Sequence, residues 1–229
     1  MAPLSTDSVD LDETPSATAH EMVYRILRAR ILEGALAPGT ALTLRGVAEA
    51  LGVSMTPARE AVRRLVAERA LALTETGRVA VPIPGGEDLD ALFTARALLE
   101  PELARRAAGR IEPEQLDRLR ALDAEIGPAI ERGDAGAYVS ANTRFHSVLY
   151  AAAEAPALLA LVESVWLQTA PSMRRVYAEL GDQATDVLAD FHLEALQALA
   201  EADTDALCAA IRADVLQGAA LLRRTISGG

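Results

Sequence analysis

Residue types that bind metals recur in the C-terminal part of the chain. Asn142 and His146 are four residues apart, so they share one face of a helix. His192 and Asp214 follow later, and inward-facing helices of a bundle can aim such side chains at one point. Two imidazoles and a carboxylate suit a divalent transition metal such as Zn²⁺, Ni²⁺, Mn²⁺ or Fe²⁺, and an Asn carbonyl oxygen can also coordinate. A histidine beside Phe is more often a core residue, so a metal-free polar cavity is the alternative.

Another group of side chains could read a nucleic acid. Arg59 and Arg63 lie at i and i+4, side by side on one helical face. The planar guanidinium group matches the O6 and N7 atoms of guanine, or a phosphate. Arg78 follows Gly77 at the tip of an expected hairpin, where it could contact the DNA backbone or minor groove. The alternative is a small helical domain whose arginines are solvated.

The charges are distributed unevenly along the chain. Its net charge is −11, and all 22 basic residues are arginine. Residues 21–82 carry nine arginines against six glutamates, whereas residues 83–229 carry thirteen arginines against twenty-three acidic residues. Residues 1–20 carry four acidic residues and no arginine. A basic segment followed by an acidic remainder indicates a nucleic-acid module joined to a domain with another task.

The composition argues against several classes of protein. Aromatic residues make up 3% of the 229 residues, too few for a platform that stacks single-stranded nucleic acid. Cys208 is the single cysteine, so neither an intrachain disulfide nor a thiolate metal cage can form. No uninterrupted apolar run is long enough to span a membrane, and the acidic N-terminus is unlike a signal peptide. We expect a cytoplasmic, mainly α-helical protein.

The elements that position the arginines begin near residue 17. A first helix buries Val23, Leu27 and Ile31, which recur every four residues. A second short helix begins at a Thr43 cap and ends at Gly52. A third helix follows, capped by Ser54 or Thr56, and buries its own apolar stripe. The segments 71–74 and 78–81 then form a small β-hairpin.

Helices alone position the candidate metal ligands. After a linker at residues 83–86, amphipathic segments follow with short connections, which favours an antiparallel all-α helical bundle. We expect Gly127-Pro128 and Pro171 to kink or interrupt their segments. The expected helices span residues 87–109, 112–132, 134–154, 156–178, 182–201 and 203–226. The chain therefore divides into a disordered tail (1–16), a DNA-binding domain (17–82), the linker, and a helical domain (87–229).

Two stretches carry a family resemblance. Residues 31–40 (ILEGALAPGT) and 47–65 (VAEALGVSMTPAREAVRRL), continuing into Gly77-Arg78, closely resemble the winged helix-turn-helix of the GntR family of bacterial transcription regulators. The resemblance implies a homodimer that binds double-stranded operator DNA. Where many members carry Arg, this chain has Met55, which lacks the bidentate contact but can touch a thymine methyl group. The implied DNA contacts lie at Arg45, Met55, Thr56, Arg59, Gly77 and Arg78. Arg63 is a further candidate, with a solvated helix charge as the alternative.

The helical half resembles the FCD effector domain of the FadR-like subfamily. In the metal-binding members that this half resembles, the ligands are an Asp-x-x-x-His pattern on one helix and a His on each of two later helices. Here Asn142 stands at the Asp position and Asp214 at that of the last His, which leaves the total ligand charge unchanged. Arg96 occupies the position of an effector-binding arginine, whose fork could clamp a carboxylate. The alternative is an intrahelical pair with Glu100 on the surface.

The resemblance therefore implies a transcription regulator that responds to a small molecule. Its helical domain would bind a small carboxylate effector, with or without a divalent metal. We expect the linker to transmit effector binding to the paired DNA-binding domains, because a ligand that favours one arrangement changes operator affinity. The alternative function is a metal-dependent enzyme that uses Asn142, His146, His192 and Asp214. No nucleophile elbow or phosphate loop accompanies that cluster.

Overall fold

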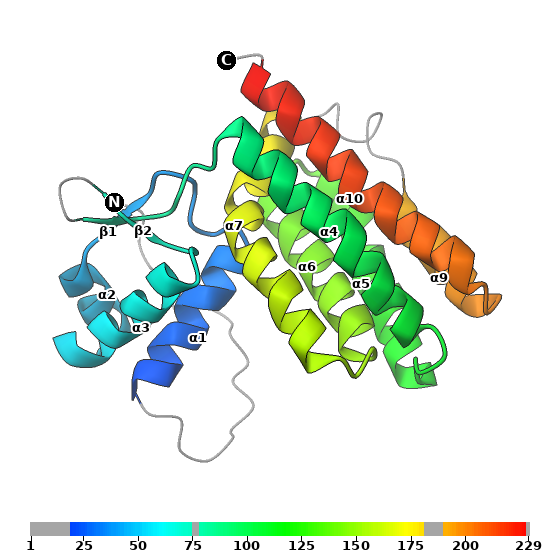
Figure 1. Ribbon diagram of the computed structural model, residues 1–229, viewed down its shortest axis with the longest axis horizontal. Helices are drawn as coiled ribbons and strands as arrows, with labels where there is room; N and C mark the ends of the chain where they lie inside the picture. The colour runs from blue at the N-terminus through cyan, green and yellow to red at the C-terminus, as the bar shows by residue number, and fades with distance from the viewer. Residues whose placement is uncertain (1–18, 75–77, 181–189, 228–229) are drawn as a thin grey trace.

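The computed structural model describes residues 19–74, 78–180 and 190–227. These residues form two parts, which we call the head (19–81) and the body (86–227), seen at the left and right of Figure 1. The mainly α-helical fold, with an N-terminal winged helix-turn-helix and a C-terminal helical bundle, is confirmed. The expected disordered tail, Gly77 and the first part of the expected helix 182–201 lie outside the described residues.

Three helices form the centre of the head, namely α1 (Ala19–Leu32), α2 (Leu44–Leu51) and α3 (Met55–Ala67). Val23, Leu27 and Ile31 are buried along α1, as their spacing predicts. The Thr43 hydroxyl caps α2 by accepting a hydrogen bond from the backbone N–H of Gly46 at 3.0 Å. The left-handed Gly52 (φ 63°) ends α2. Helix α3 begins at Met55, three residues after the Gly52 cap, so a tight turn joins α2 to α3.

The N-cap of α3 settles an alternative that the sequence left open. Ser54 occupies this position, with extended backbone angles and no side-chain capping bond. The helix therefore begins at Met55, and the alternative cap at Thr56 is wrong. Pro57 still falls within the first turn, where backbone N–H groups have no partner inside the helix.

The wing is a three-stranded antiparallel sheet. It contains β1 (Ala41–Leu42), β2 (Ala72–Leu73) and β3 (Val79–Ala80), in the order β1-β3-β2. Ala80 pairs with Ala41 on one side and with Ala72 on the other. The predicted hairpin is confirmed, whereas the sequence did not reveal β1. A strand of two residues is too short to show an alternating pattern.

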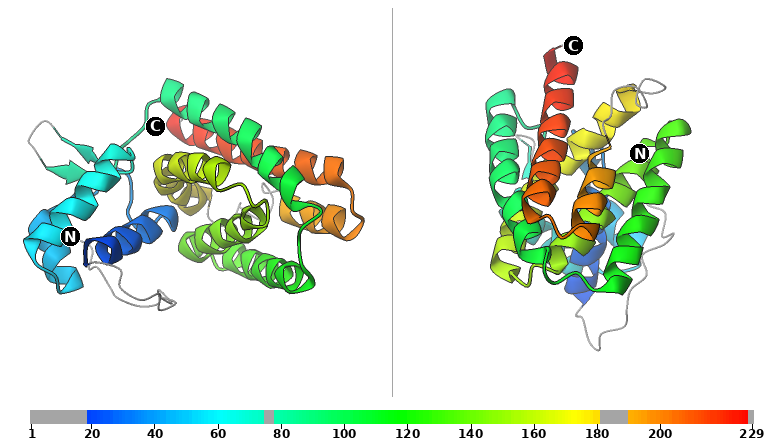
Figure 2. Two further views of the ribbon diagram at one scale, coloured as in Figure 1. Left: turned by 60° about the horizontal axis from the view of Figure 1, so that its bottom comes forward. Right: turned by 90° about the vertical axis from the view of Figure 1, so that its right-hand side faces the viewer.

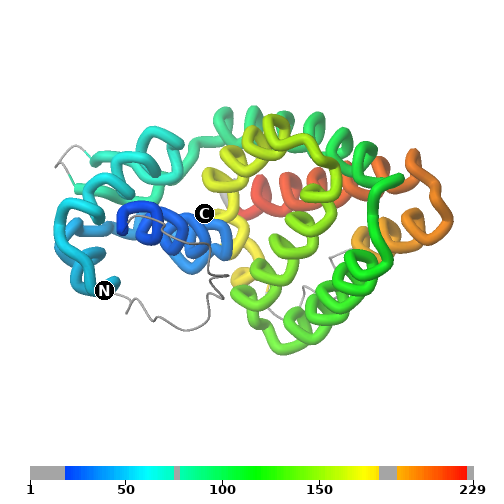
Figure 3. Tube along the Cα trace, turned by 90° about the horizontal axis from the view of Figure 1, so that it is seen from below, coloured from blue at the N-terminus to red at the C-terminus, as the bar shows by residue number. Residues whose placement is uncertain are grey.

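The body is a bundle of roughly antiparallel helices, seen from three further sides in Figures 2 and 3. The described ends of the helices lie within a few residues of the predicted ones, with one exception: the helix predicted to start at residue 182 begins at Phe191, after an Asp190 cap. Helices α5 and α7 continue through Pro128 and Pro171, so the expected interruptions are not found. Pro171 is buried within α7 although it cannot donate a helical hydrogen bond. The helices are α4 (Gly86–Ala107), α5 (Pro113–Glu131), α6 (Ala135–Ala151), α7 (Pro156–Leu180), α9 (Phe191–Ala200) and α10 (Thr204–Ser227).

The main core of the body lies where α4, α5, α6, α7, α9 and α10 meet. Leu103, Phe145 and Leu207 are fully buried in it. A separate core fills the head, and Leu167 of α7 belongs to that core although it comes from the body. Among the described helices, none combines the length and apolar character needed to cross a membrane.

Candidate functional site

A cavity of about 50 Å³ lies in the body among α4, α6, α7 and α10. One part of its wall is polar and another is apolar. The volume is enough for a few water molecules or a very small ligand without rearrangement. The lining residues are Leu32, Arg96, Val139, Asn142, Thr143, His146, Trp166, Thr169, Ala170, Met173, Tyr177, Asp214, Val215 and Gly218.

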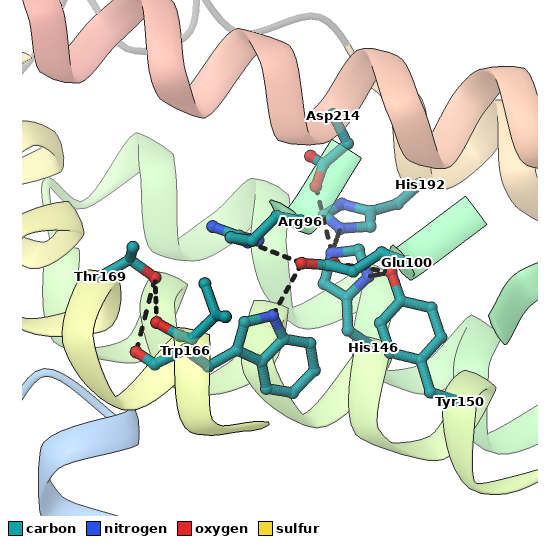
Figure 4. Close-up of polar contacts among 9 residues, drawn as sticks. Arg96, Glu100, His146, Tyr150, Trp166, Thr169, His192 and Asp214 are labelled. Carbon is teal, nitrogen blue, oxygen red and sulfur yellow. Dashed lines mark hydrogen bonds and ion pairs between the residues drawn. The ribbon is translucent and has the colours of Figure 1, made fainter. Parts of the chain in front are cut away.

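Three of the four predicted metal ligands meet at one point beside this cavity (Figure 4). The Nε2 atom of His146 lies 3.2 Å from Oδ2 of Asp214 and 3.3 Å from Nε2 of His192. The two histidines are almost completely buried. Asn142, one turn before His146 on α6, lines the same cavity. Helices α6, α9 and α10 thus bring together side chains that are far apart in the sequence.

A chain of hydrogen bonds, the histidine relay, favours a proton on Nδ1 of His146. The Tyr150 hydroxyl donates to Oε2 of Glu100 at 2.9 Å, so its oxygen is left to accept from Nδ1–H of His146 at 3.1 Å. Neutral His146 then carries no proton on Nε2, and that lone pair points at the carboxylate of Asp214. Two lone pairs 3.2 Å apart repel each other unless a proton or a metal cation lies between them. These two atoms are therefore placed to share a proton or to bind one cation.

The pKa values favour the metal-binding forms of two ligands. Burial lowers the pKa of His192 to about 4, so this imidazole is neutral at neutral pH. Burial alone would raise the pKa of Asp214. When Nε2 of His146 carries a proton, its hydrogen bond to Asp214, the nearby histidines and Arg96 outweigh burial and lower that pKa to about 2. A neutral imidazole and an ionised carboxylate are the forms that coordinate metals.

Glu100 is a buried acceptor at the centre of the polar network. Its Oε1 atom accepts from Nε of Arg96 at 2.6 Å and from Nε1 of Trp166 at 2.9 Å. Its Oε2 atom accepts from the Tyr150 hydroxyl. The side chain is completely buried, so Arg96 compensates its charge inside the bundle. Glu100 thereby connects the candidate effector arginine to the histidine relay.

For Arg96, the sequence suggested either an effector-binding side chain or an intrahelical pair with Glu100, and the structure has features of both. The intrahelical pair with Glu100 exists, but it is buried and not on the surface as expected. Arg96 also lines the cavity, and its guanidinium end extends past Glu100 towards Thr169 in Figure 4. Among the described residues, no partner hydrogen-bonds its Nη1 or Nη2 atom. One edge of the guanidinium is used, and the other faces the cavity.

The predicted DNA contacts that the structure describes are exposed on the head. Thr56, Arg59 and Arg78 are exposed, and 40% of Met55 is accessible. Arg45 is 83% exposed and pairs with Glu49 at 2.7 Å. A pair of this kind between exposed side chains is weak and can open when DNA approaches.

The two later arginines of α3 differ in their surroundings. Arg63 is 73% exposed and makes only a 3.5 Å contact with Glu60. Arg64 lies over the ring of Tyr24, with its guanidinium carbon 3.6 Å from the ring centre, and pairs with Glu21 and Glu68. Arg63 thus stays available for a partner, whereas Arg64 packs α3 against α1.

Comparison with known families agrees with this architecture. Residues 19–81 match the bacterial regulatory proteins of the gntR family, and residues 91–216 match the FCD domain, which alone covers more than half of the chain. The chain belongs to the GntR family and carries an FCD domain. The alternative of a metal-dependent enzyme is therefore wrong, because these domains belong to transcription regulators and not to enzymes. The chain is a DNA-binding transcription regulator.

Individual GntR-family relatives match over nearly the whole chain. The HTH-type transcriptional regulator McbR of Escherichia coli is 30% identical over 192 residues, which cover 83% of this chain and 86% of McbR. The transcriptional repressor RspR of the same organism is 27% identical over 210 residues, 87% of each chain. The structure of E. coli McbR/YncC has a TM-score of 0.85 at 26% identity and covers 92% of this chain and 100% of its own. A GntR regulator from Rhodococcus has a TM-score of 0.73 at 22% identity, over 90% and 98% of the two chains.

Sequence reasoning missed several residues of the site. Tyr150 carries no motif; it follows His146 by four residues on α6, but its bond to Glu100 on α4 appears only in the fold. Leu32 lines the cavity although it comes from the head. Glu100 was visible as a partner four residues from Arg96, but this spacing is the same for a surface pair and a buried one.

Proposed function

We propose that this GntR-family regulator binds operator DNA as a homodimer and changes its operator affinity when a small carboxylate enters the cavity of the body. A divalent metal held by His146, His192 and Asp214, with Asn142 beside them, would anchor that carboxylate. The observation that carries the proposal is the convergence of these side chains beside a cavity that also presents the free edge of Arg96.

The donor set fits a divalent transition metal. Ligand atoms about 2.1 Å from one ion are separated by roughly 3.0–3.4 Å. The two measured separations, 3.2 Å and 3.3 Å, match this spacing. A cation would also relieve the repulsion between the lone pairs of His146 and Asp214. The Tyr150 hydroxyl supports the arrangement, because it favours the His146 tautomer that leaves Nε2 free.

The charges of the cavity favour an anionic effector. Arg96 and Glu100 compensate each other, and Asp214 adds one negative charge. A divalent ion at the site leaves one net positive charge, which a monocarboxylate neutralises. The free edge of Arg96 can donate to the carboxylate oxygens, while Val139, Met173 and Val215 offer apolar contacts to a short carbon chain.

Metal content tests the proposed site directly. The purified protein is incubated with Zn²⁺, Ni²⁺ or Mn²⁺, dialysed and analysed by elemental mass spectrometry. We expect about one metal per chain, lost in His146→Ala and Asp214→Ala because each removes a ligand. His20→Ala, which changes the histidine at the start of α1, is the matched control and should retain the metal. Absence of metal from the parent protein would show that the metal part of the proposal is wrong.

Operator binding tests the proposed DNA surface. Duplexes are first selected by the full-length protein from a random pool. Arg59→Ala should weaken specific binding by about 1–3 kcal/mol if this side chain contacts a base edge. Light scattering should give twice the 24.2 kDa mass of one chain. Unchanged operator affinity in Arg59→Ala, or a monomeric protein, would contradict the corresponding part of the proposal.

A further inference from the structure

Helix α7 is shared between the cavity and the head. Trp166, Thr169 and Met173 lie on the side of α7 that lines the cavity. The adjacent Leu167 is 2% exposed and is part of the hydrophobic core of the head. Residues 166 and 167 therefore face the cavity and the head, respectively, from the same turn of α7. A shift of the cavity wall moves the surface on which the head is packed, because a helix is a stiff element.

The last turn of α1 reaches from the head into the cavity. Leu32 lines the cavity and packs against the hydrophobic cores of both head and body. Its backbone carbonyl accepts a hydrogen bond from the hydroxyl of Thr143 at 3.3 Å. Thr143 also lines the cavity and is the next residue after Asn142. A residue of the DNA-binding part thus forms one wall of the candidate effector site.

Two further contacts hold α1 against α7. Nη1 of Arg174 donates to the carbonyl of Gly34 at 3.1 Å. Gly34 is left-handed (φ +63°), and a Cβ atom there would lie 2.8 Å from Cβ of Arg174, so only glycine allows this approach. Nearer the middle of α1, Arg28 pairs with Glu163 at 2.6 Å. Helix α1 lies beside α7 (Figures 1 and 2).

The connecting linker makes few contacts by comparison. A Cβ atom built on Gly85 or Gly86 would meet nothing within 4 Å, and Ile83 is 74% exposed. Pro82 and Pro84 beside them are half-buried. The contacts of α1 with α6 and α7 offer a second route between the cavity and the head, besides the linker that the sequence suggested.

We propose that the last turn of α1 completes the effector cavity and reports its occupancy to the DNA-binding head, through Leu32, Thr143 and the Arg174–Gly34 contact. The inference rests on the proposed function for the identity of the cavity as an effector site. It adds that the head contributes a wall to this site, so the ligand and the position of α1 must be compatible. Coupling between two binding sites is reciprocal, so operator binding to the head must in turn alter the cavity.

Trp166 provides a native reporter for this reverse effect. It is the only tryptophan of the chain, it lines the cavity and it is 6% exposed. Quenching of its fluorescence by acrylamide therefore measures access to the cavity. The experiment compares the quenching constant of the full-length protein with and without a saturating duplex selected from a random pool. An unrelated duplex of the same length is the DNA control.

The test variants remove the hydrogen bonds to Leu32, at the end of α1, and to Gly34, just after it, and they keep the side-chain volume. Thr143→Val removes the donor to Leu32, and Arg174→Met removes the donor to Gly34 but keeps an aliphatic chain. The matched controls are Ser147→Ala on α6 and Arg175→Met on α7, because Ser147 bonds within its own helix and Arg175 pairs with Glu179 on its own helix. Thermal unfolding of each variant verifies that the protein is folded.

We expect operator binding to change the Trp166 quenching constant in the parent and in both controls, and to change it little in the double variant Thr143→Val/Arg174→Met. In a second measurement, Zn²⁺ should change the operator Kd of the parent and controls by roughly 5- to 150-fold, the usual range for coupled sites. In the double variant, this ratio should fall below about twofold.

The outcomes separate the inference from the proposed function. If Zn²⁺ binds neither the parent nor any variant, the proposed metal site is wrong. The effect of operator DNA on Trp166 quenching still tests the inference in that case. If operator binding leaves Trp166 quenching unchanged in the parent, the inference is overturned. It is equally overturned if the double variant responds like the parent, or if the two controls lose the response as well.

Discussion

At the scale of single residues, the site depends on buried charges that compensate each other. Glu100 accepts three hydrogen bonds while completely buried, and Arg96 supplies the positive charge that permits this. The residue types and the spacing of four were visible in the sequence. Their burial was not, because it depends on which face of α4 the other helices cover. The three converging metal-ligand candidates were also chosen from the sequence, but only the fold brings them to one point.

Removing the charge of Glu100 should destabilise the body. Glu100→Gln leaves Arg96 as a buried cation without its counter-charge, and breaking one partner of a buried pair costs about 3–5 kcal/mol. Urea unfolding followed by circular dichroism measures the free energy of unfolding. Glu102→Gln is the control, since Glu102 pairs with Arg106 on the surface and should change stability by less than about 1 kcal/mol. Equal effects of the two substitutions would contradict a structural role for the buried pair.

The Tyr150 hydroxyl should tune metal affinity without contacting the metal. Tyr150→Phe removes the acceptor for Nδ1–H of His146, so the ring can rotate or change its tautomer. Loss of such an outer partner typically weakens metal binding about 10–100-fold. Competition with a chelator measures the affinity, and Tyr24→Phe in the head is the control. Parent-like metal affinity in Tyr150→Phe would show that the relay does not orient His146.

At the scale of elements, local signals in the sequence placed most helices. Thr43 and Gly52 begin and end α2 as predicted, because capping depends on residues a few positions apart. Local reasoning was weaker where the tertiary structure decides, as at Pro171 inside α7 and at the two-residue strand β1. It gave no indication that α1 would pack against α7, since this contact joins residues more than a hundred positions apart, such as Arg28 and Glu163.

The cap of α2 should contribute measurably to the stability of the head. Thr43→Ala removes the acceptor for the N–H of Gly46 and should cost about 1 kcal/mol. Thr94→Ala is the control, because the Thr94 hydroxyl bonds to a carbonyl inside its own helix and caps nothing. Urea unfolding measures both variants. A smaller loss in Thr43→Ala than in Thr94→Ala would mean that α2 is held by packing alone.

At the scale of the whole molecule, the distribution of charge matches the division into head and body. The acidic body should repel DNA, which confines DNA contact to the head. Helix α3 presents Met55, Thr56 and Arg59 near its start, where a recognition helix contacts base edges. Many members of the family have Arg in place of Met55, so this position should give the chain an operator preference of its own.

Met55→Arg should change which operator the protein selects. A guanidinium at this exposed position can form a bidentate contact with guanine, worth about 1–3 kcal/mol against another base. Selection of duplexes from a random pool, with parent and variant in parallel, should therefore reveal a new guanine at one position of each half-site. Met55→Lys separates base recognition from simple attraction, because it adds the same charge without the planar fork. It should raise affinity for all duplexes and leave the selected sequence unchanged. Identical selected sequences for Met55→Arg and the parent would place residue 55 away from the bases.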